Sequence, residues 1–151
     1  MKKILFKGAG SAVPTPFNEN GVNLEEFKRF LQFQIDNDID ALIVCGTTGE
    51  SSTMTRDEKI IAINCALEVA NEKTPVIVGT GSNNTKEAIE MSKIAERLGA
   101  DGILVVTPYY NKTTQRGLIA HYKAIAESVS LPIILYNVPS RTGVNIEPKT
   151  C

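Results

Sequence analysis

The stretch Ile133-Ile134-Leu135-Tyr136-Asn137-Val138-Pro139-Ser140-Arg141-Thr142-Gly143 decides how the rest of the chain is interpreted. It begins as an apolar run of branched residues, which is typical of a buried parallel strand. Tyr136 would lie at the C-terminal end of this strand, where α/β folds place their chemistry. Pro139 removes a backbone donor and ends the strand. Arg141 presents a charged fork that suits a carboxylate or a phosphate, although a plain turn with a solvated arginine fits these residues equally well.

The pattern of a branched apolar strand followed by an amphipathic helix recurs along the chain. Strands are predicted to start at Ala41, Val76, Ile103 and Ile133, about 30 residues apart, which is the size of one βα unit. Between them, helical spacing groups the apolar residues Leu24, Phe27, Leu31 and Ile35; Ile60, Ile63, Leu67 and Ala70; Ala88, Met91, Ala95 and Leu98; and Leu118, Tyr122, Ile125 and Val129. The alternation predicts a parallel sheet. Either a five-stranded doubly wound sheet or part of an eight-fold barrel, which typically needs ~250 residues, satisfies it.

Local signals set the boundaries of these elements. Capping boxes are predicted at Asn23 and Glu26, at Thr55 and Glu58, and at Asn84 and Glu87. Gly99 is expected as a C-cap, and Glu147-Pro148 as the first turn of a fifth helix. A first strand is expected at Ser11-Ala12-Val13, and a turn from Asn18 to Gly21.

Composition excludes several classes of function. The chain has 151 residues, which fits one domain, and its formal net charge of -1 provides no field for nucleic acid or an anionic membrane. No stretch is apolar enough to cross a bilayer, and the start Met1-Lys2-Lys3-Ile4-Leu5-Phe6 lacks the apolar region of a signal peptide. The spacing of Cys45, Cys65 and Cys151 suits neither zinc nor a disulfide framework, so a cytoplasmic protein is expected, with Cys45 in the core.

Three motifs follow the predicted strands. The glycines of Gly46-Thr47-Thr48-Gly49-Glu50 allow a tight turn whose N–H groups converge on an anion, and its hydroxyls offer a proton path; a plain loop is the alternative. Gly79-Thr80-Gly81 resembles part of a dinucleotide fingerprint, but Asn84 replaces the third glycine, so a nucleotide site is not expected. The adjacent rings of Tyr109-Tyr110 favour burial against loops or against another subunit.

The remaining polar residues do not point to a metal or to a catalytic triad. His121 is the only histidine and lies mid-helix, so it is predicted to be a surface residue. No cluster of histidines and carboxylates suggests a metal site, and no cofactor is expected.

Taken together, three segments closely resemble the dihydrodipicolinate synthase family: Gly46 to Ser51, Val105 to Asn111, and Tyr136 to Gly143. The resemblance implies a TIM (β/α)8 barrel, of which residues 1–151 would form the N-terminal part of a single domain, with strands 1–5 and the start of helix 5. It also implies a cytoplasmic lyase of lysine (diaminopimelate) biosynthesis that works without a cofactor. Such an enzyme condenses pyruvate with aspartate semialdehyde through a lysine Schiff base, and it is a homotetramer, a dimer of dimers.

By the same resemblance, five residues take substrate roles. Thr47, Tyr136 and Tyr110 match a hydroxyl relay that moves protons, with Tyr110 reaching into the neighbouring subunit. Thr48 matches the group that holds the pyruvate carboxylate. Arg141 matches the residue that engages the carboxylate of the semialdehyde, and a guanidinium fork suits that task.

A regulatory lysine site is implied as well. Ser51, Asn83, Glu87 and Tyr109 match its positions. Feedback-sensitive members commonly carry histidines where this chain has Arg56 and Lys59. Because these two side chains are cations, weak inhibition by lysine or none is expected.

One feature departs from the family pattern. The Schiff-base lysine is expected at the end of a sixth strand, beyond Cys151, and Lys112 is the nearest substitute by loop position. The alternatives that stay open are a sister aldolase such as an N-acetylneuraminate lyase, a non-catalytic carboxylate-binding relative and a flavodoxin-like signalling domain. Arg141 favours the synthase, because sister aldolases usually lack it. Cys45 and Val78 argue against the signalling domain, which needs acidic residues at strand ends.

Overall fold

A single curved parallel sheet forms the centre of the molecule. The computed structural model describes residues 4–151. Met1-Lys2-Lys3, which the signal-peptide prediction includes, lie outside the described residues. The five strands stand in the order β1 (Gly10–Ala12), β4 (Ala41–Val44), β5 (Val76–Gly79), β6 (Gly102–Val106) and β7 (Ile133–Tyr136), and all neighbours pair in parallel. The predicted turn from Asn18 to Gly21 is a small hairpin of β2 (Phe17–Asn18) and β3 (Gly21–Val22).

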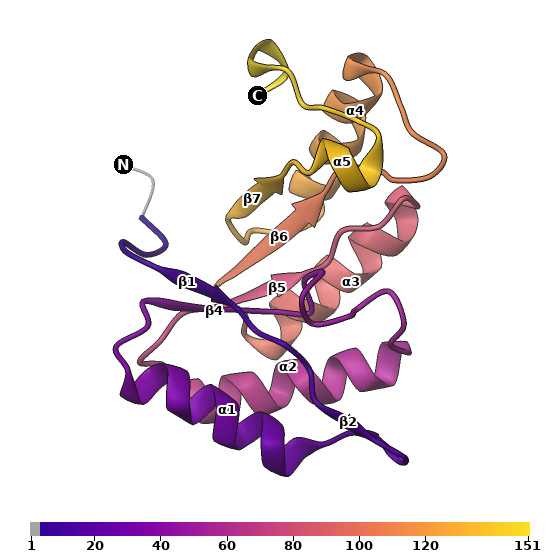
Figure 1. The fold of residues 1–151 in the computed structure, drawn as a ribbon. Coiled ribbons are helices and arrows are strands. Elements are labelled where there is room, and N and C mark those ends of the chain that lie inside the picture. The colour runs from indigo at the N-terminus through magenta and orange to yellow at the C-terminus, as the bar shows by residue number, and fades with distance from the viewer. Residues whose placement is uncertain (1–3) are drawn as a thin grey trace.

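Four helices connect the strands of the sheet and lie along its outer side (Figure 1). They are α1 (Leu24–Asp36), α2 (Arg56–Ala70), α3 (Thr85–Leu98) and α4 (Gln115–Ala126). Each crossover advances by one strand in the same direction, whereas a doubly wound sheet reverses its order at a switch point. Of the two architectures that the sequence allowed, the structure therefore has the barrel type, and it forms a half barrel.

Alternation along the strands divides the molecule into a sealed outer core and a partly open inner face. Val44, Val78 and Val105 are fully buried toward the helices, where they belong to one cluster with Phe27 and Leu31. Their neighbours Ile43, Leu104 and Val106 are only partly buried. Successive strand residues point to opposite faces, so the second set faces the interior of the half barrel.

The helix boundaries follow the predictions, but several details differ. Gly99 is a left-handed C-cap, as predicted, and Thr55 with Glu58 forms a complete capping box. Asn23 and Asn84 cap their helices, but no reciprocal box forms, because the glutamates pair with arginines elsewhere. Leu24 is 40% exposed although it was predicted to be inward, since it is the first residue of α1 and its side chain points back beyond the helix.

Two further predictions need correction near the C-terminal end. His121 is not a surface residue: only 5% of it is exposed, and its Nδ1 lies 2.9 Å from the Thr85 Oγ1 because position 121 shares the inward face of α4 with Leu118. Burial lowers the pKa of His121, which favours the neutral ring. The turn after Tyr136 contains a short helix, α5 (Pro139–Thr142), and the expected fifth helix is a 3-10 turn, η1 (Pro148–Thr150).

Residues 4–151 contain neither a membrane-spanning helix nor a cluster of metal ligands. None of the helices there combines the length and apolarity that a membrane span requires. The same residues contain no group of three or more histidine, cysteine, aspartate or glutamate side chains that could hold a metal ion.

Candidate functional site

The loops that follow β4, β5, β6 and β7 surround one cavity of about 460 Å³ at the C-terminal ends of the strands. Parallel strands bring these ends to one edge of the sheet, so segments far apart in the sequence converge there. Leu104 and Val106 extend the lining down the inner face of the half barrel. The cavity therefore combines an apolar floor with a polar rim, which is typical of a small-molecule site.

The loop after β4 supplies a threonine and two serines to this cavity. Thr47, Ser51 and Ser52 line it, whereas Thr48, which is exposed like Thr47, does not. The loop is held in shape by a hydrogen bond from the Glu50 N–H to the Thr47 carbonyl at 3.1 Å and by one from the Thr15 hydroxyl to the Gly49 carbonyl at 2.9 Å.

Cys45, at the start of this loop, is in the core as predicted. It is only 2% exposed, and it also lines the cavity. Burial raises the pKa of its thiol to about 12, against the opposing charge of Lys59. The thiol is therefore neutral at physiological pH and is a poor nucleophile.

The loop after β6 carries the two adjacent tyrosines. Tyr109 is partly buried, whereas Tyr110 is 90% exposed and has a left-handed backbone with φ of 65°. Both line the cavity. The Asn111 side chain donates to the Asn83 carbonyl at 3.3 Å and so links this loop to the one after β5. An exposed ring in a restrained loop suits a contact beyond this chain.

The last residue of β7, Tyr136, and the turn that follows it, with Arg141, reach the same cavity. The Asn137 side chain fixes the strand end, since it accepts from the Ile146 N–H at 3.0 Å and donates to the Asn145 side chain at 2.8 Å. Arg141 lies on α5, which ends at Gly143 with φ of 68°. Its exposed guanidinium has no ion-pair partner within residues 4–151, so it is available to an anion.

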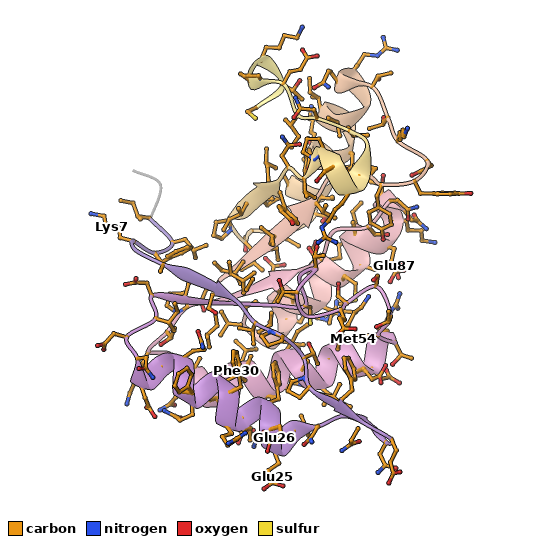
Figure 2. The ribbon with its side chains drawn as sticks, in the orientation of Figure 1. Lys7, Glu25, Glu26, Phe30, Met54 and Glu87 are labelled. Carbon is orange, nitrogen blue, oxygen red and sulfur yellow. The ribbon has the colours of Figure 1, made fainter. Side chains whose placement is uncertain are left out.

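A cluster of three charged side chains, Arg56, Glu87 and Glu90, lies between α2 and α3. The Arg56 Nη2 is 3.0 Å from one Glu87 oxygen, 3.1 Å from the other and 3.1 Å from a Glu90 oxygen. Figure 2 labels Glu87 in the first turn of α3. Glu87 lines the cavity, so its carboxylate is already engaged by Arg56 at the cavity rim.

The structure brings together seven of the nine residues that the sequence predicts for the two sites. The cavity is lined by Thr47, Ser51, Glu87, Tyr109, Tyr110, Tyr136 and Arg141. Asn83 instead lines a second cavity of about 360 Å³, together with Lys112 and His121. Within residues 4–151, no hydrogen bond directly joins the hydroxyls of Thr47, Tyr110 and Tyr136.

By resemblance, sequence reasoning placed Lys59 near the regulatory lysine site, and this side chain lines the cavity from α2. Lys112, which loop position suggested as the nearest lysine, is instead exposed at the second cavity. Thr80 also lines the cavity and is 3% exposed. Sequence reasoning gave Thr80 no role in the site. The only sequence signal for its segment is the pattern Gly79-Thr80-Gly81.

Comparison with known proteins gives consistent matches over nearly the whole chain. A family model described as the dihydrodipicolinate synthetase family matches residues 5–151. A 4-hydroxy-tetrahydrodipicolinate synthase from Acetivibrio thermocellus is 58% identical over 150 residues, which cover 99% of this chain and 51% of that protein.

Solved structures agree in fold. A dihydrodipicolinate synthase from Thermotoga maritima has a TM-score of 0.95 at 50% identity and matches 97% of this chain and 50% of that one. The enzyme from Acinetobacter baumannii complexed with pyruvate has a TM-score of 0.93 at 48% identity, over 95% of this chain and 50% of that one. The one from Cyanidioschyzon merolae with lysine bound has a TM-score of 0.94 at 41% identity, over 98% and 51%. The chain thus spans about half the length of these relatives.

Proposed function

The chain belongs to the dihydrodipicolinate synthetase family, and on this premise we propose that it provides part of the active site of a 4-hydroxy-tetrahydrodipicolinate synthase. Such an enzyme condenses pyruvate with aspartate 4-semialdehyde in lysine (diaminopimelate) biosynthesis, and we locate this one in the cytoplasm. The observation that carries the proposal is the convergence of Thr47, Tyr136 and Arg141 on one cavity, from the loop after β4, the end of β7 and the turn after β7. The pyruvate bound to the Acinetobacter baumannii relative supports the first substrate.

In the proposed reaction, the hydroxyls of Thr47, Tyr110 and Tyr136 move protons. Pyruvate condenses with a lysine amine, and the carbinolamine oxygen must gain a proton before it leaves as water. Each hydroxyl can accept one proton while it donates another, so a chain of them transfers a proton without holding a charge. Tyr110 is 90% exposed, which supports a role in the cavity of a neighbouring subunit of a homotetramer.

Two further groups would bind carboxylates. Thr48 does not line the cavity itself, but it is exposed next to Thr47, which does, and its hydroxyl and the backbone N–H groups of its loop suit the pyruvate carboxylate. The exposed Arg141 suits the carboxylate of the semialdehyde, since a guanidinium fork can donate two parallel hydrogen bonds. Neither contact requires a metal or a cofactor.

The Schiff-base lysine is proposed to lie outside residues 1–151. Lys59 lines the cavity from a helix, and its position near the N-terminal end of α2 differs from the strand end that the family resemblance implies. Lys112 is exposed and lines the second cavity instead of the first.

The test compares a full-length version of the protein with residues 1–151. After incubation with pyruvate and reduction with borohydride, intact mass should show one pyruvate adduct on the full-length version and none on residues 1–151. The full-length version should also consume pyruvate and aspartate semialdehyde together and leave N-acetylneuraminate unchanged. Cleavage of N-acetylneuraminate would instead favour a sister aldolase. Binding of pyruvate without an adduct would favour a non-catalytic relative.

A regulatory lysine site is proposed around Ser51, Asn83, Glu87 and Tyr109. The lysine-bound structure of the Cyanidioschyzon merolae relative supports such a site in the family. In this chain the Glu87 carboxylate, which suits the ammonium of the ligand, is paired with Arg56. We therefore propose that lysine inhibits this enzyme weakly or not at all.

A further inference from the structure

The segment Gly79-Thr80-Gly81 lies at the end of β5, the middle strand of the sheet, between the ends of β4 and β6. All three residues line the cavity, yet none has a role in the proposed chemistry. Their sequence resembles part of a nucleotide-binding fingerprint without matching it. The packing around each residue gives a different explanation for the pattern.

Gly79 permits the end of β4 to fold across β5. A Cβ atom at position 79 would lie 2.1 Å from the Cys45 carbonyl oxygen and 3.0 Å from the Gly46 nitrogen. Both contacts are with backbone, so no side chain can rotate away to relieve them. Cys45 has a left-handed backbone with φ of 55°, a conformation that is costly for a residue with a side chain. The bend at Cys45, which leads into Thr47 and Thr48, therefore occupies space that only a glycine leaves free.

Gly81 leaves similar room for the backbone at the end of β6, on the other side of β5. A Cβ atom there would lie 2.4 Å from the Val106 nitrogen and 2.8 Å from its Cγ1. Val106 is the last residue of β6, and the loop that carries Tyr109 and Tyr110 starts after it. The position of this second loop thus also depends on a missing side chain.

Thr80 anchors the segment between the two glycines. Its N–H donates to the Leu104 carbonyl at 3.1 Å, and its hydroxyl lies 2.9 Å from the Ser92 hydroxyl on α3. The Ser92 hydroxyl donates in turn to the Ala88 carbonyl at 2.7 Å. Thr80 and Ser92 are 3% and 0% exposed, so this chain of bonds is shielded from water.

We propose that Gly79-Thr80-Gly81 is a positioning element of the cavity. Gly79 determines the position of the loop that carries Thr47, and Gly81 determines that of the loop that carries Tyr109. Thr80 fixes the segment between them by its hydrogen bond to Ser92 on α3. Both glycines act through the backbone of the neighbouring strands, since the atoms closest to an added Cβ belong to Cys45 and to Val106. The kinetic part of this inference rests on the proposed function, whereas the structural part does not.

The test uses Gly79→Ala and Gly81→Ala in a full-length version of the protein. An added methyl requires the opposing backbone to retreat by about 1 Å to reach ordinary contact, and a shift of that size costs roughly 100-fold in rate. Gly79→Ala should raise the KM for pyruvate and slow the formation of the borohydride-trapped adduct. Gly81→Ala should lower kcat while the KM for pyruvate changes less. Crystal structures of the variants should show displaced Cα atoms at Thr47 and at Tyr109, respectively.

Val78→Ala is the matched control. Val78 is a buried residue of the same strand that does not line the cavity, so its truncation should lower Tm and leave kcat/KM unchanged at temperatures where the variant is folded. If an alanine at 79 or 81 prevents folding, Thr80→Val and Thr80→Ser decide. Thr80→Val should shift both KM and kcat, and Thr80→Ser, which keeps the hydroxyl, should restore them.

The possible failures are distinguishable. An inactive parent protein would overturn the proposed function, and the Cα displacements would still test the positioning element. An active parent whose Gly79→Ala and Gly81→Ala variants keep both loops in place and retain full activity would overturn the positioning element alone.

Discussion

Arg141 is the residue on which the choice of substrate depends most directly. Its guanidinium is exposed at the cavity and has no ion-pair partner within residues 4–151. In a full-length version, Arg141→Ala should lower kcat/KM for aspartate semialdehyde about ten- to a hundred-fold, because a lost charge-assisted hydrogen bond costs about 1.5–3 kcal/mol. Formation of the pyruvate Schiff base should be nearly unchanged. Steady-state kinetics and borohydride trapping measure the two effects separately.

Two control variants sharpen this prediction. Arg141→Lys keeps the charge but loses the planar fork, so its activity should fall between those of the parent and the alanine variant. Arg116→Ala removes an exposed arginine of α4 that does not line the cavity, and it should have no effect. An unchanged kcat/KM for the semialdehyde in Arg141→Ala would refute the assigned role.

Arg56 sets the expected response to lysine. It would compete with the ligand ammonium for Glu87, because its guanidinium is already paired with both Glu87 oxygens and would repel a second cation there. The side chains of Arg56 and Glu87 are 47% and 41% exposed, so solvent screens this repulsion, and the expected loss of affinity is about fivefold. Arg56→Ala should therefore lower the lysine concentration that half-inhibits the enzyme.

Initial rates across a lysine titration measure this response in a full-length version. Arg29→Ala is the control, since Arg29 pairs with Glu26 on α1 and does not line the cavity. Strong inhibition of the parent enzyme at concentrations well below about 1 mM lysine would contradict the prediction.

At the scale of single elements, the spacing of apolar residues predicted the strands and helices, but the hydrogen-bond partners of their polar side chains were harder to predict. Strand starts and apolar faces follow from local sequence, because a strand or a helix must bury one face. The Thr55 box could be predicted because both partners lie in one turn. The Asn84 box failed because Glu87 has a stronger partner in Arg56, 31 positions away in the sequence. His121 was misplaced for a similar reason, since its partner Thr85 lies on another helix.

The same separation applies to the candidate site. Thr47, Tyr136 and Arg141 were predictable because they lie at or shortly after the C-terminal ends of strands, and these ends converge in any parallel sheet. The roles of Gly79 and Gly81 were not predictable, because a missing Cβ has meaning only when the neighbouring backbones are known. Lys59 reaches the cavity from the first turn of a helix, a position that no strand-end pattern marks.

The carboxylates of Glu58 and Glu96, which accept hydrogen bonds from Thr55 and Ser130, should make the stability of the fold depend on pH. Hydrogen bonds from Thr55 lower the pKa of Glu58 at the start of α2, and hydrogen bonds from the Ser130 hydroxyl and N–H lower the pKa of Glu96. A carboxyl whose pKa is lower in the folded state stabilises the fold above its unfolded pKa, and this contribution is lost as pH falls through the folded pKa. The urea midpoint should therefore fall as the solution is acidified below about pH 4.5.

Two variants distinguish the contribution of Glu96 to this pH dependence from that of the other carboxylates. Glu96→Gln keeps an oxygen that can accept from Ser130 but cannot titrate, so its urea midpoint should change less between pH 5 and pH 3 than that of the parent protein, values that bracket the usual glutamate pKa of about 4.3. Glu19→Gln, in the exposed turn between β2 and β3, is the control and should follow the parent curve. Parallel curves for Glu96→Gln and the parent would show that the Ser130 contact adds nothing.

At the scale of the whole molecule, the five-stranded sheet has two open edges. The outer edges of β1 and β7 have no ladder partner within residues 4–151. Leu135 in β7 is 38% exposed, and the inner-face residues Leu104 and Val106 are only partly buried. Unpaired edges with exposed apolar side chains are templates for pairing with another chain. Residues 1–151 in isolation should therefore self-associate.

A charge placed on the open edge should oppose that association. Leu135→Lys puts an ammonium on β7, where a second copy would have to bury it, so light scattering after size exclusion should show a shift toward monomer across a dilution series. Ile119→Lys is the matched control, because Ile119 is 49% exposed on α4 and belongs to neither edge strand. If both lysine variants dissociate equally, general surface hydrophobicity and not the sheet edge drives association. If the parent chain is monomeric at every concentration and unfolds cooperatively, the two open edges are tolerated and the half barrel is a stable unit by itself.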